Sequence, residues 1–201
     1  MWAATFTGSL SGTGLEVGGD WTGAELSWVV SQDGTQWSYE YTIRTPEHAT
    51  SHFIVETSPG FAVDNFLSPE LDFEVGTFAN GKSNPGMPGG LLGVKVQDFE
   101  DVVGLWTDAS GAPLGEQVVI TVLSDKTPVW GDFYAKGSSD CFLYNAGFSL
   151  DDPTAAASSG SIDFHVLRPD TAVVPLPGAV LLAALGLGCV AWCFRREFPA
   201  V

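Results

Sequence analysis

Residues 37–44 alternate strictly between apolar and polar side chains, and this pattern limits the fold more than any other. The apolar set is Trp37, Tyr39, Tyr41 and Ile43. The polar set between them is Ser38, Glu40, Thr42 and Arg44. A period of two is that of a β-strand with one buried and one exposed face. The strand-like segment 25–30 and an Asp33-Gly34 pair come just before it, so the sequence predicts an antiparallel hairpin with its turn at 31–35.

Further strand-like segments follow along the chain, with turn residues about every dozen positions. They cover 52–57, 73–78, 91–96, 117–123, 129–135, 141–148 and 161–167. The segment 117–123 is the most apolar, and we expect it to be a central strand that buries Ile120 and pairs with 129–135. No helical crossover, which a parallel sheet would require, separates the segments. The sequence therefore predicts an all-β fold, either an antiparallel β-sandwich or a jelly roll.

The chain is strongly acidic and poor in cysteine. Its 201 residues include 24 Asp and Glu but only 8 Lys and Arg, which gives a net charge of −16. Such a field repels the phosphate backbone, so the composition excludes nucleic acid as a partner. Three cysteines are too few for a disulfide framework. We expect Cys141, the one cysteine outside the C-terminal region, to be a small buried thiol.

The C-terminal region contains a run of 17 residues, 178–194, without a charge. As a helix it would be about 26 Å long, enough to cross a thin bilayer. Arg195 and Arg196 follow it, which predicts that the C-terminus is cytoplasmic and the acidic body lies outside. The alternative is a buried C-terminal helix of a globular domain, because runs shorter than about 18 residues occur in both settings.

A short proline motif precedes this run and consists of Val174, Pro175, Leu176 and Pro177. The order of motif, apolar run and arginine pair resembles the C-terminal sorting signal of the PEP-CTERM family of bacterial envelope proteins, in its V-P-L-P variant. The resemblance implies export in a Gram-negative bacterium, transient anchoring in the inner membrane and processing by an exosortase-type membrane protease. It also implies association with exopolysaccharide and the cell surface. Leu176 departs from the family pattern, in which this position is acidic.

The body is also similar to ectodomains that carry such tails, in the stretches 51–56, 84–89, 128–136 and 144–148. The expected organisation is an acidic β-sandwich ectodomain at 1–168, a linker with the V-P-L-P motif at 169–177, a transmembrane or sorting helix at 178–194 and a basic cytoplasmic tail at 195–201. The first six residues lack the basic and apolar regions of an export signal, so we expect the true start to lie upstream of Met1.

Residues 76–83 match the Walker A pattern letter for letter. A phosphate-binding loop of this kind must run into a helix, whose N-terminus holds the phosphate. Here the next residues, 84–90, are rich in proline and glycine and do not propagate a helix. We therefore interpret 76–83 as a loop between two strands and expect no nucleotide partner.

The three histidines are candidates for metal or catalytic chemistry. His48 and His52 are four residues apart, which would put both on one face of a helix. Pro46 and the β-branched residues after His52 predict instead a turn that enters a strand, with both histidines on the surface. Asp163 and His165 would share a face of the last strand, as an ion pair or half of a catalytic dyad. No nucleophile-elbow or zinc-protease motif accompanies them.

Acidic residues gather at two places in the predicted loops, Asp98, Glu100 and Asp101 in the first and Asp151 and Asp152 in the second. Oxygen-rich loops of this kind bind Ca²⁺ in some β-sandwiches. The D-x-D-x-D-G pattern is absent, so we interpret both as solvated acidic surface and expect no cofactor. No spacing singles out a carboxylate pair for glycoside hydrolysis.

Four tryptophans near predicted strand ends bear on sugar binding: Trp21, Trp28, Trp106 and Trp130. Flat rings stack on sugar faces, although most tryptophans of β-proteins pack in the core. The function we expect is that of an exported cell-surface or exopolysaccharide-matrix protein with a non-catalytic structural or adhesive role. The alternatives are a carbohydrate-binding module that tethers exopolysaccharide and a secreted hydrolase with an Asp/Glu site.

Overall fold

The structure is a computed structural model of the chain, and it describes residues 4–61, 72–97, 103–107, 110–138 and 140–170. The chain divides into two compact units, Met1–Thr171 and Ala172–Val201, and every described residue belongs to the first. The sorting motif at 174–177, the apolar run 178–194 and the arginine pair therefore lie outside the described residues, as do the acidic residues at 98–101. Among the residues described, no helix has the length and apolarity needed to cross a membrane.

The described residues form antiparallel strands and one short 3₁₀ helix, η1 (Gly12–Gly14). The strands are β1 (Thr5–Ser11), β2 (Leu15–Gly18), β3 (Glu25–Asp33), β4 (Gln36–Thr45), β5 (Thr50–Glu56), β6 (Asp72–Phe78), β7 (Leu91–Gln97), β8 (Val103–Thr107), β9 (Pro113–Ser124), β10 (Pro128–Gly131), β11 (Phe133–Gly137), β12 (Phe142–Asn145) and β13 (Val166–Pro169). A five-stranded sheet has the order β1-β3-β4-β9-β8, and a six-stranded sheet has the order β2-β12-β11-β5-β7-β6. Strands β10 and β13 form a separate pair.

The predicted hairpin is strands β3 and β4 of the five-stranded sheet. Their register pairs Asp33 with Gln36 and leaves Gly34 and Thr35 as a two-residue turn. The apolar side chains of 37–44 are all buried, whereas the polar side chains between them are half-buried or exposed. The alternation in the sequence thus predicted both the strand and the side of it that faces the core.

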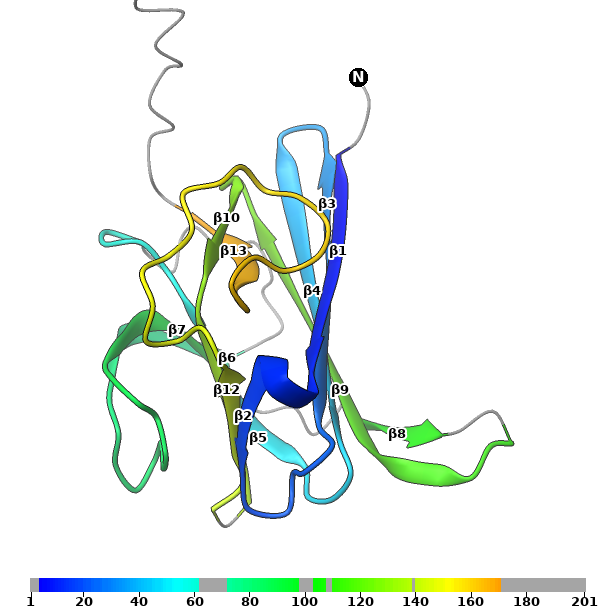
Figure 1. The fold of residues 1–201 in the computed structure, drawn as a ribbon. Helices are drawn as coiled ribbons and strands as arrows, with labels where there is room; N and C mark the ends of the chain where they lie inside the picture. The colour runs from blue at the N-terminus through cyan, green and yellow to red at the C-terminus, as the bar shows by residue number, and fades with distance from the viewer. Residues whose placement is uncertain (1–3, 62–71, 98–102, 108–109, 139, 171–201) are drawn as a thin grey trace, which may run out of the picture. The chain divides into compact units, whose positions relative to one another are not determined.

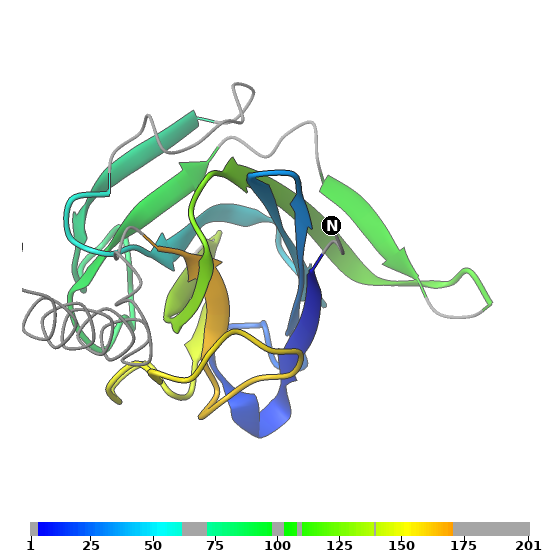
Figure 2. The ribbon, with the colours of Figure 1, turned by 90° about the horizontal axis from the view of Figure 1, so that it is seen from above.

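The two larger sheets share one hydrophobic core, and Figures 1 and 2 show their strands around a common interior. Tyr41 of β4 and Phe53 of β5 lie across it with ring centroids 5.0 Å apart. The ring centroids of Phe53 and Phe133 are 5.9 Å apart, and Phe133 lies on β11, the neighbour of β5 in the same sheet. The all-β class with antiparallel sheets is therefore confirmed, and two sheets packed on one core are consistent with a β-sandwich.

The prediction of a single strand at 129–135 that pairs with 117–123 is wrong. The segment is two strands, β10, which pairs with β13, and β11, which pairs with β5 and β12. Strand β9 pairs instead with β4 and, near its start, with β8. The partner of β10 is β13, the last strand along the described chain. The periodicity of a segment carries no information about a partner so far away in sequence.

Several other boundaries differ from the prediction. Strands β1, β2 and β8 were not predicted; β1 is built largely from Thr, Ser and Gly, which give no apolar period. The predicted strand 141–148 is extended only over β12, and the predicted strand 161–167 only from Val166. The fold continues through Asp170, whose N–H donates to the carbonyl of Thr127 over 3.1 Å.

Replacement of Ile120 tests the core. Ile120 is fully buried on the apolar face of β9, opposite Tyr41 of β4. We expect Ile120→Ala to lower the free energy of unfolding by about 2–5 kcal/mol, through lost apolar burial and the cavity left behind. The melting temperature in a thermal scan should fall by several degrees. Lys126→Ala in the turn after β9 is the control, and we expect a change below about 0.5 kcal/mol; equal effects of the two variants would contradict the assignment of β9.

Candidate functional site

The candidate site begins where the chain leaves the sheet between β10 and β11. At Asp132 both backbone groups bond to Glu56, the last residue of β5. The Asp132 N–H donates to the Glu56 carboxylate over 2.8 Å, and its carbonyl accepts from the Glu56 N–H over 2.9 Å. This break in the strand places the Asp132 side chain, which is 9% exposed, among other polar groups in the interior.

A tight turn at 162–165 supplies the second part of the site. The His165 N–H donates to the Ile162 carbonyl over 2.8 Å, and Asp163 and Phe164 both have positive φ, 47° and 63°. Such values are uncommon for residues other than glycine and mark a constrained backbone. Gly147 lies directly against this turn, because a Cβ there would collide with the Asp163 carbonyl and the His165 ring. The close approach therefore requires glycine at 147.

The turn overturns the prediction that Asp163 and His165 share a strand face. Asp163 is exposed, whereas His165 is completely buried. The left-handed backbone at Asp163 and Phe164 breaks the period of two, so the side chains on either side of Phe164 point to different environments. His165 instead faces two other carboxylates.

Asp132, Asp152 and His165 converge from three segments of the chain. The His165 Nε2 atom lies 3.5 Å from the Asp132 Oδ1 atom and 3.9 Å from the Asp152 Oδ1 atom. One ligand atom from each residue lies within 4.8 Å of those of the other two, an arrangement able to hold a metal ion. Asn145 of β12 orients Asp132, because its Nδ2 donates to the same Oδ1 atom over 2.7 Å. We call Asp132, Asp152 and His165 the triad below.

Arg168 of β13 lies beside the triad and links it to β5. Its guanidinium is buried, and its NH2 group contacts Asp152 at 3.1 Å and Glu56 at 3.6 Å. Its NH1 group lies 3.8 Å from Asp170 and donates to the Ser58 hydroxyl over 3.3 Å. The stem of the arginine runs against Gly131, where a Cβ would collide with Nε. The prediction that Asp152 is solvated surface is therefore wrong, because Asp152 pairs with a buried arginine.

Carboxyl groups outnumber basic groups in this cluster. Glu56, Asp132, Asp152 and Asp170 surround the single permanent cation Arg168. Burial raises the pKa of Glu56 to about 7 in spite of the opposing effect of Arg168. Burial also raises the pKa of Asp132, although the Asn145 hydrogen bond and His165 act in the other direction. Burial therefore favours the protonated, neutral form of both of these carboxyl groups.

Sequence reasoning missed most of this cluster. It singled out His165 and Asp152 but gave them the wrong partners, and it did not identify Glu56, Asp132 or Arg168. A signal was present, because Asp132 and Arg168 are each charged residues within short apolar segments. Charged side chains are rarely buried unless they are paired. A charged residue within an apolar segment therefore predicts a buried contact with an opposite charge.

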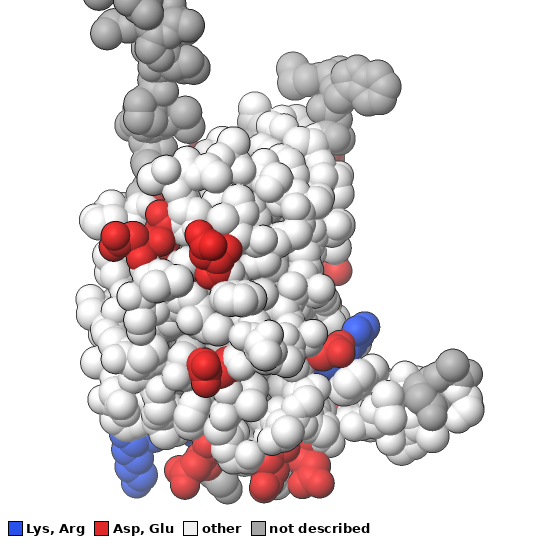
Figure 3. Space-filling model, viewed as in Figure 1, with Lys and Arg blue, Asp and Glu red and all other residues white. Residues whose placement is uncertain are grey.

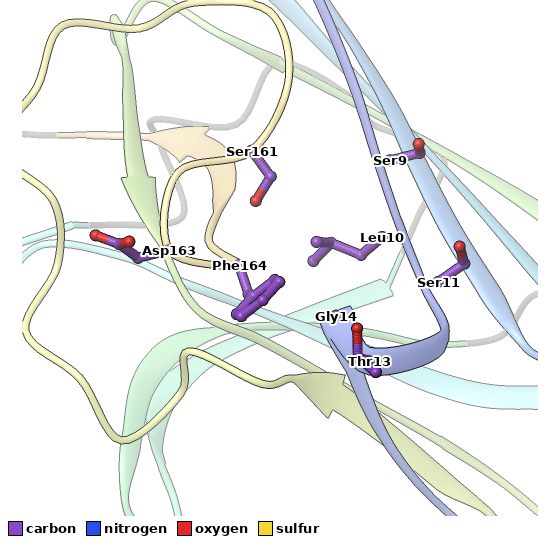
Figure 4. A pocket seen from close by; sticks show the side chains of 8 residues that line it. All are labelled: Ser9, Leu10, Ser11, Thr13, Gly14, Ser161, Asp163 and Phe164. Atoms are coloured by element: carbon purple, nitrogen blue, oxygen red, sulfur yellow. The ribbon is translucent and has the colours of Figure 1, made fainter.

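A pocket of about 370 Å³ opens on the other side of the same turn. The residues that line it are Ser9, Leu10, Ser11, Thr13, Gly14, Ser161, Asp163 and Phe164. Figure 4 shows the Phe164 ring between Leu10 of β1 and the turn. The ring is 45% exposed, unusual for so large an apolar side chain. The pocket thus combines an exposed aromatic residue with the hydroxyl-bearing residues Thr13 and Ser161.

The other predicted site residues are not brought together. His48 is exposed and lies 3.6 Å from Asp20, as the surface prediction required. His52 is half-buried in β5 and bonds to Asn84 over 3.0 Å, so the surface prediction is wrong for it. The Walker-like segment runs from β6 into a turn closed by Gly81 and Asn84, and the chain continues to β7. The predicted loop is therefore confirmed for 79–83, whereas 76–78 are the end of β6.

The four tryptophans considered for sugar stacking are mostly core residues. Trp21, Trp28 and Trp130 are buried, as is the Cys141 thiol. Trp106 is half-buried, and the Arg44 guanidinium lies 5.8 Å from its ring centroid. Of the four, Trp106 alone keeps some exposed area.

Acidic side chains outnumber basic ones on the face of the molecule seen in Figure 3. This distribution follows the net charge of −16. Comparison of the chain with protein-family models, with curated proteins and with solved structures found no match. The function must therefore be argued from the sequence and the geometry above.

His52 should make stability depend on pH. Burial lowers its pKa to about 4, well below the usual value of 6.5, so the unfolded chain binds more protons between these values. The stabilising contribution is complete above pH 6.5 and is lost as the pH falls towards 4. We expect it to reach at most about 3 kcal/mol. Urea unfolding of the wild type and of His52→Gln at several pH values measures the difference, which should shrink across this window; a constant difference would contradict it.

Proposed function

We propose that the chain is an exported cell-surface or exopolysaccharide-matrix protein with a non-catalytic structural or adhesive role. The observation that carries the proposal is the order of V-P-L-P motif, uncharged run 178–194 and arginine pair. In this proposal 178–194 forms a helix that anchors the chain in the inner membrane, with the β-domain outside the cytoplasm. An exosortase-type protease is the proposed partner at the motif, before release to the surface or matrix.

The described domain supports a role outside the cytoplasm. A β-sandwich built from two antiparallel sheets is a common architecture of cell-surface domains. The acidic surface keeps such a domain soluble and repels anionic polymers, which favours neutral partners. The carboxylates with raised pKa are engaged by protein groups, since Glu56 binds the Asp132 N–H and Asp132 binds Asn145. These contacts favour a structural role for the cluster over that of a hydrolase.

The pocket at Phe164 favours a second candidate, a carbohydrate-binding module that tethers exopolysaccharide. An exposed aromatic ring offers a sugar its flat apolar face, and the hydroxyls of Thr13 and Ser161 offer hydrogen bonds. The buried tryptophans of the core do not take part in this candidate.

A fusion tests the sorting proposal. Residues 173–201 joined to a soluble reporter with its own signal peptide should place the reporter in the membrane fraction, because the uncharged run favours the bilayer. The matched control carries Leu182→Arg and Leu185→Arg. Each arginine costs about 2.5–3.5 kcal/mol at the centre of a membrane helix, so the control should be soluble. A wild-type fusion that stays wholly soluble would refute the proposal.

A glycan array tests the carbohydrate candidate. We expect binding to neutral polysaccharides, and Phe164→Ala should weaken it about tenfold or more through loss of one aromatic anchor. Leu150→Ala is the matched control, because Leu150 is 58% exposed and is not among the residues that line the pocket. The absence of binding to every neutral glycan, or equal binding by Phe164→Ala, would exclude this use of the pocket.

A further inference from the structure

The protonation of His165 follows from its contacts. The Nδ1 atom lies 3.2 Å from the carbonyl oxygen of Ile162. A carbonyl oxygen only accepts hydrogen bonds, so Nδ1 carries the proton. In the neutral ring the Nε2 atom then has a free lone pair. Among the described residues Nε2 is buried without a hydrogen-bond partner, and it faces the two carboxylate oxygens of the triad.

This arrangement leaves the buried Nε2 atom without a hydrogen bond. A proton on Nε2 would make the ring a cation that attracts both carboxylates, but the distances of 3.5 and 3.9 Å are longer than a charge-assisted hydrogen bond. A cation placed between the three atoms satisfies all of them together.

The spacing of the three atoms fits a metal ion. Zinc bonds to nitrogen and oxygen are about 2.0–2.2 Å long, so neighbouring ligands of a tetrahedral ion are about 3.3–3.6 Å apart. The observed distances from Nε2 are close to this range. The bond from Nδ1 to a backbone carbonyl and the bond from Asn145 to Asp132 are the outer contacts that typically orient metal ligands.

We propose that Asp132, Asp152 and His165 bind a divalent transition-metal cation, with zinc the best fit. An imidazole nitrogen with two carboxylates suits Zn²⁺ or Mn²⁺, whereas Ca²⁺ takes oxygen ligands alone. The site is independent of the sorting proposal, because it uses only residues of the β-domain.

The cation would join the connection after β12 to the end of the β10–β13 pair, in which Gly131 and Val166 are partners. Asp132 lies at the break between β10 and β11, Asp152 in the long connection after β12, and His165 in the turn before β13. The residue before His165 is Phe164, whose ring lines the pocket. Metal binding therefore fixes the position of the turn that carries the pocket's aromatic ring.

The test uses the full chain without a histidine tag, in detergent, after removal of metal with a chelator. Zinc titration by calorimetry should give one ion per chain and raise the melting temperature. His165→Gln and Asp152→Asn should each weaken zinc binding by about 100-fold or more. Asp152 is half-exposed, and the side-chain amide of Asp152→Asn can still accept a hydrogen bond from Arg168. This variant should therefore fold and report on zinc binding even if His165→Gln does not fold.

His48→Gln is the matched control, because Asp20, His48 and Cys141 are a second group able to hold a metal. We expect its zinc affinity to stay at the wild-type value. Cobalt in place of zinc should give a spectrum without a thiolate-to-metal band, since the triad has no sulfur. The absence of zinc binding by the wild type, loss of binding in His48→Gln or full binding by Asp152→Asn would each overturn the proposal.

Discussion

The burial of Arg168 is the interaction on which the rest of the polar interior depends. A guanidinium removed from water costs several kcal/mol unless its donors find acceptors. Here the acceptors come from β5, from the connection after β12 and from the segment after β13. Because the partners of Arg168 come from separate segments, these segments are held together by a shared requirement rather than by apolar packing alone.

The same requirement explains the break at Asp132. A continuous strand through 129–135 would commit the Asp132 backbone to a neighbouring strand. The Asp132 carbonyl keeps such a bond, to the Glu56 N–H of β5, but the Asp132 N–H donates to the Glu56 carboxylate, which also lies 3.6 Å from Arg168. Tyr41 extends the connection into the five-stranded sheet, because its hydroxyl donates to the Leu167 carbonyl beside Arg168 over 2.8 Å. The apolar core and the polar cluster thus share the residues of β4 and β13.

The sequence predicted what local periodicity determines. The strand at 37–44, its buried face and the burial of Ile120 follow from a period of two, since each side chain's environment depends on its neighbours along the strand. The pairing of β10 with β13 and the convergence on Arg168 depend on contacts between residues distant in sequence. Phe164 shows a third limit, because positive φ at a bulky aromatic residue runs against local preference and arises only where the surrounding fold imposes it.

The turn at 162–165 connects the two candidate sites. Its constrained backbone sends Phe164 outward to the pocket and His165 inward to the carboxylates, one residue apart. Strain of this kind persists only where surrounding contacts hold it. Gly147 supplies the space, the Ser161 hydroxyl donates to the His165 carbonyl over 2.8 Å, and Gly160 bonds to β1 through the Thr7 carbonyl. The turn therefore contributes one of two adjacent side chains to each candidate site, Phe164 to the pocket and His165 to the buried cluster.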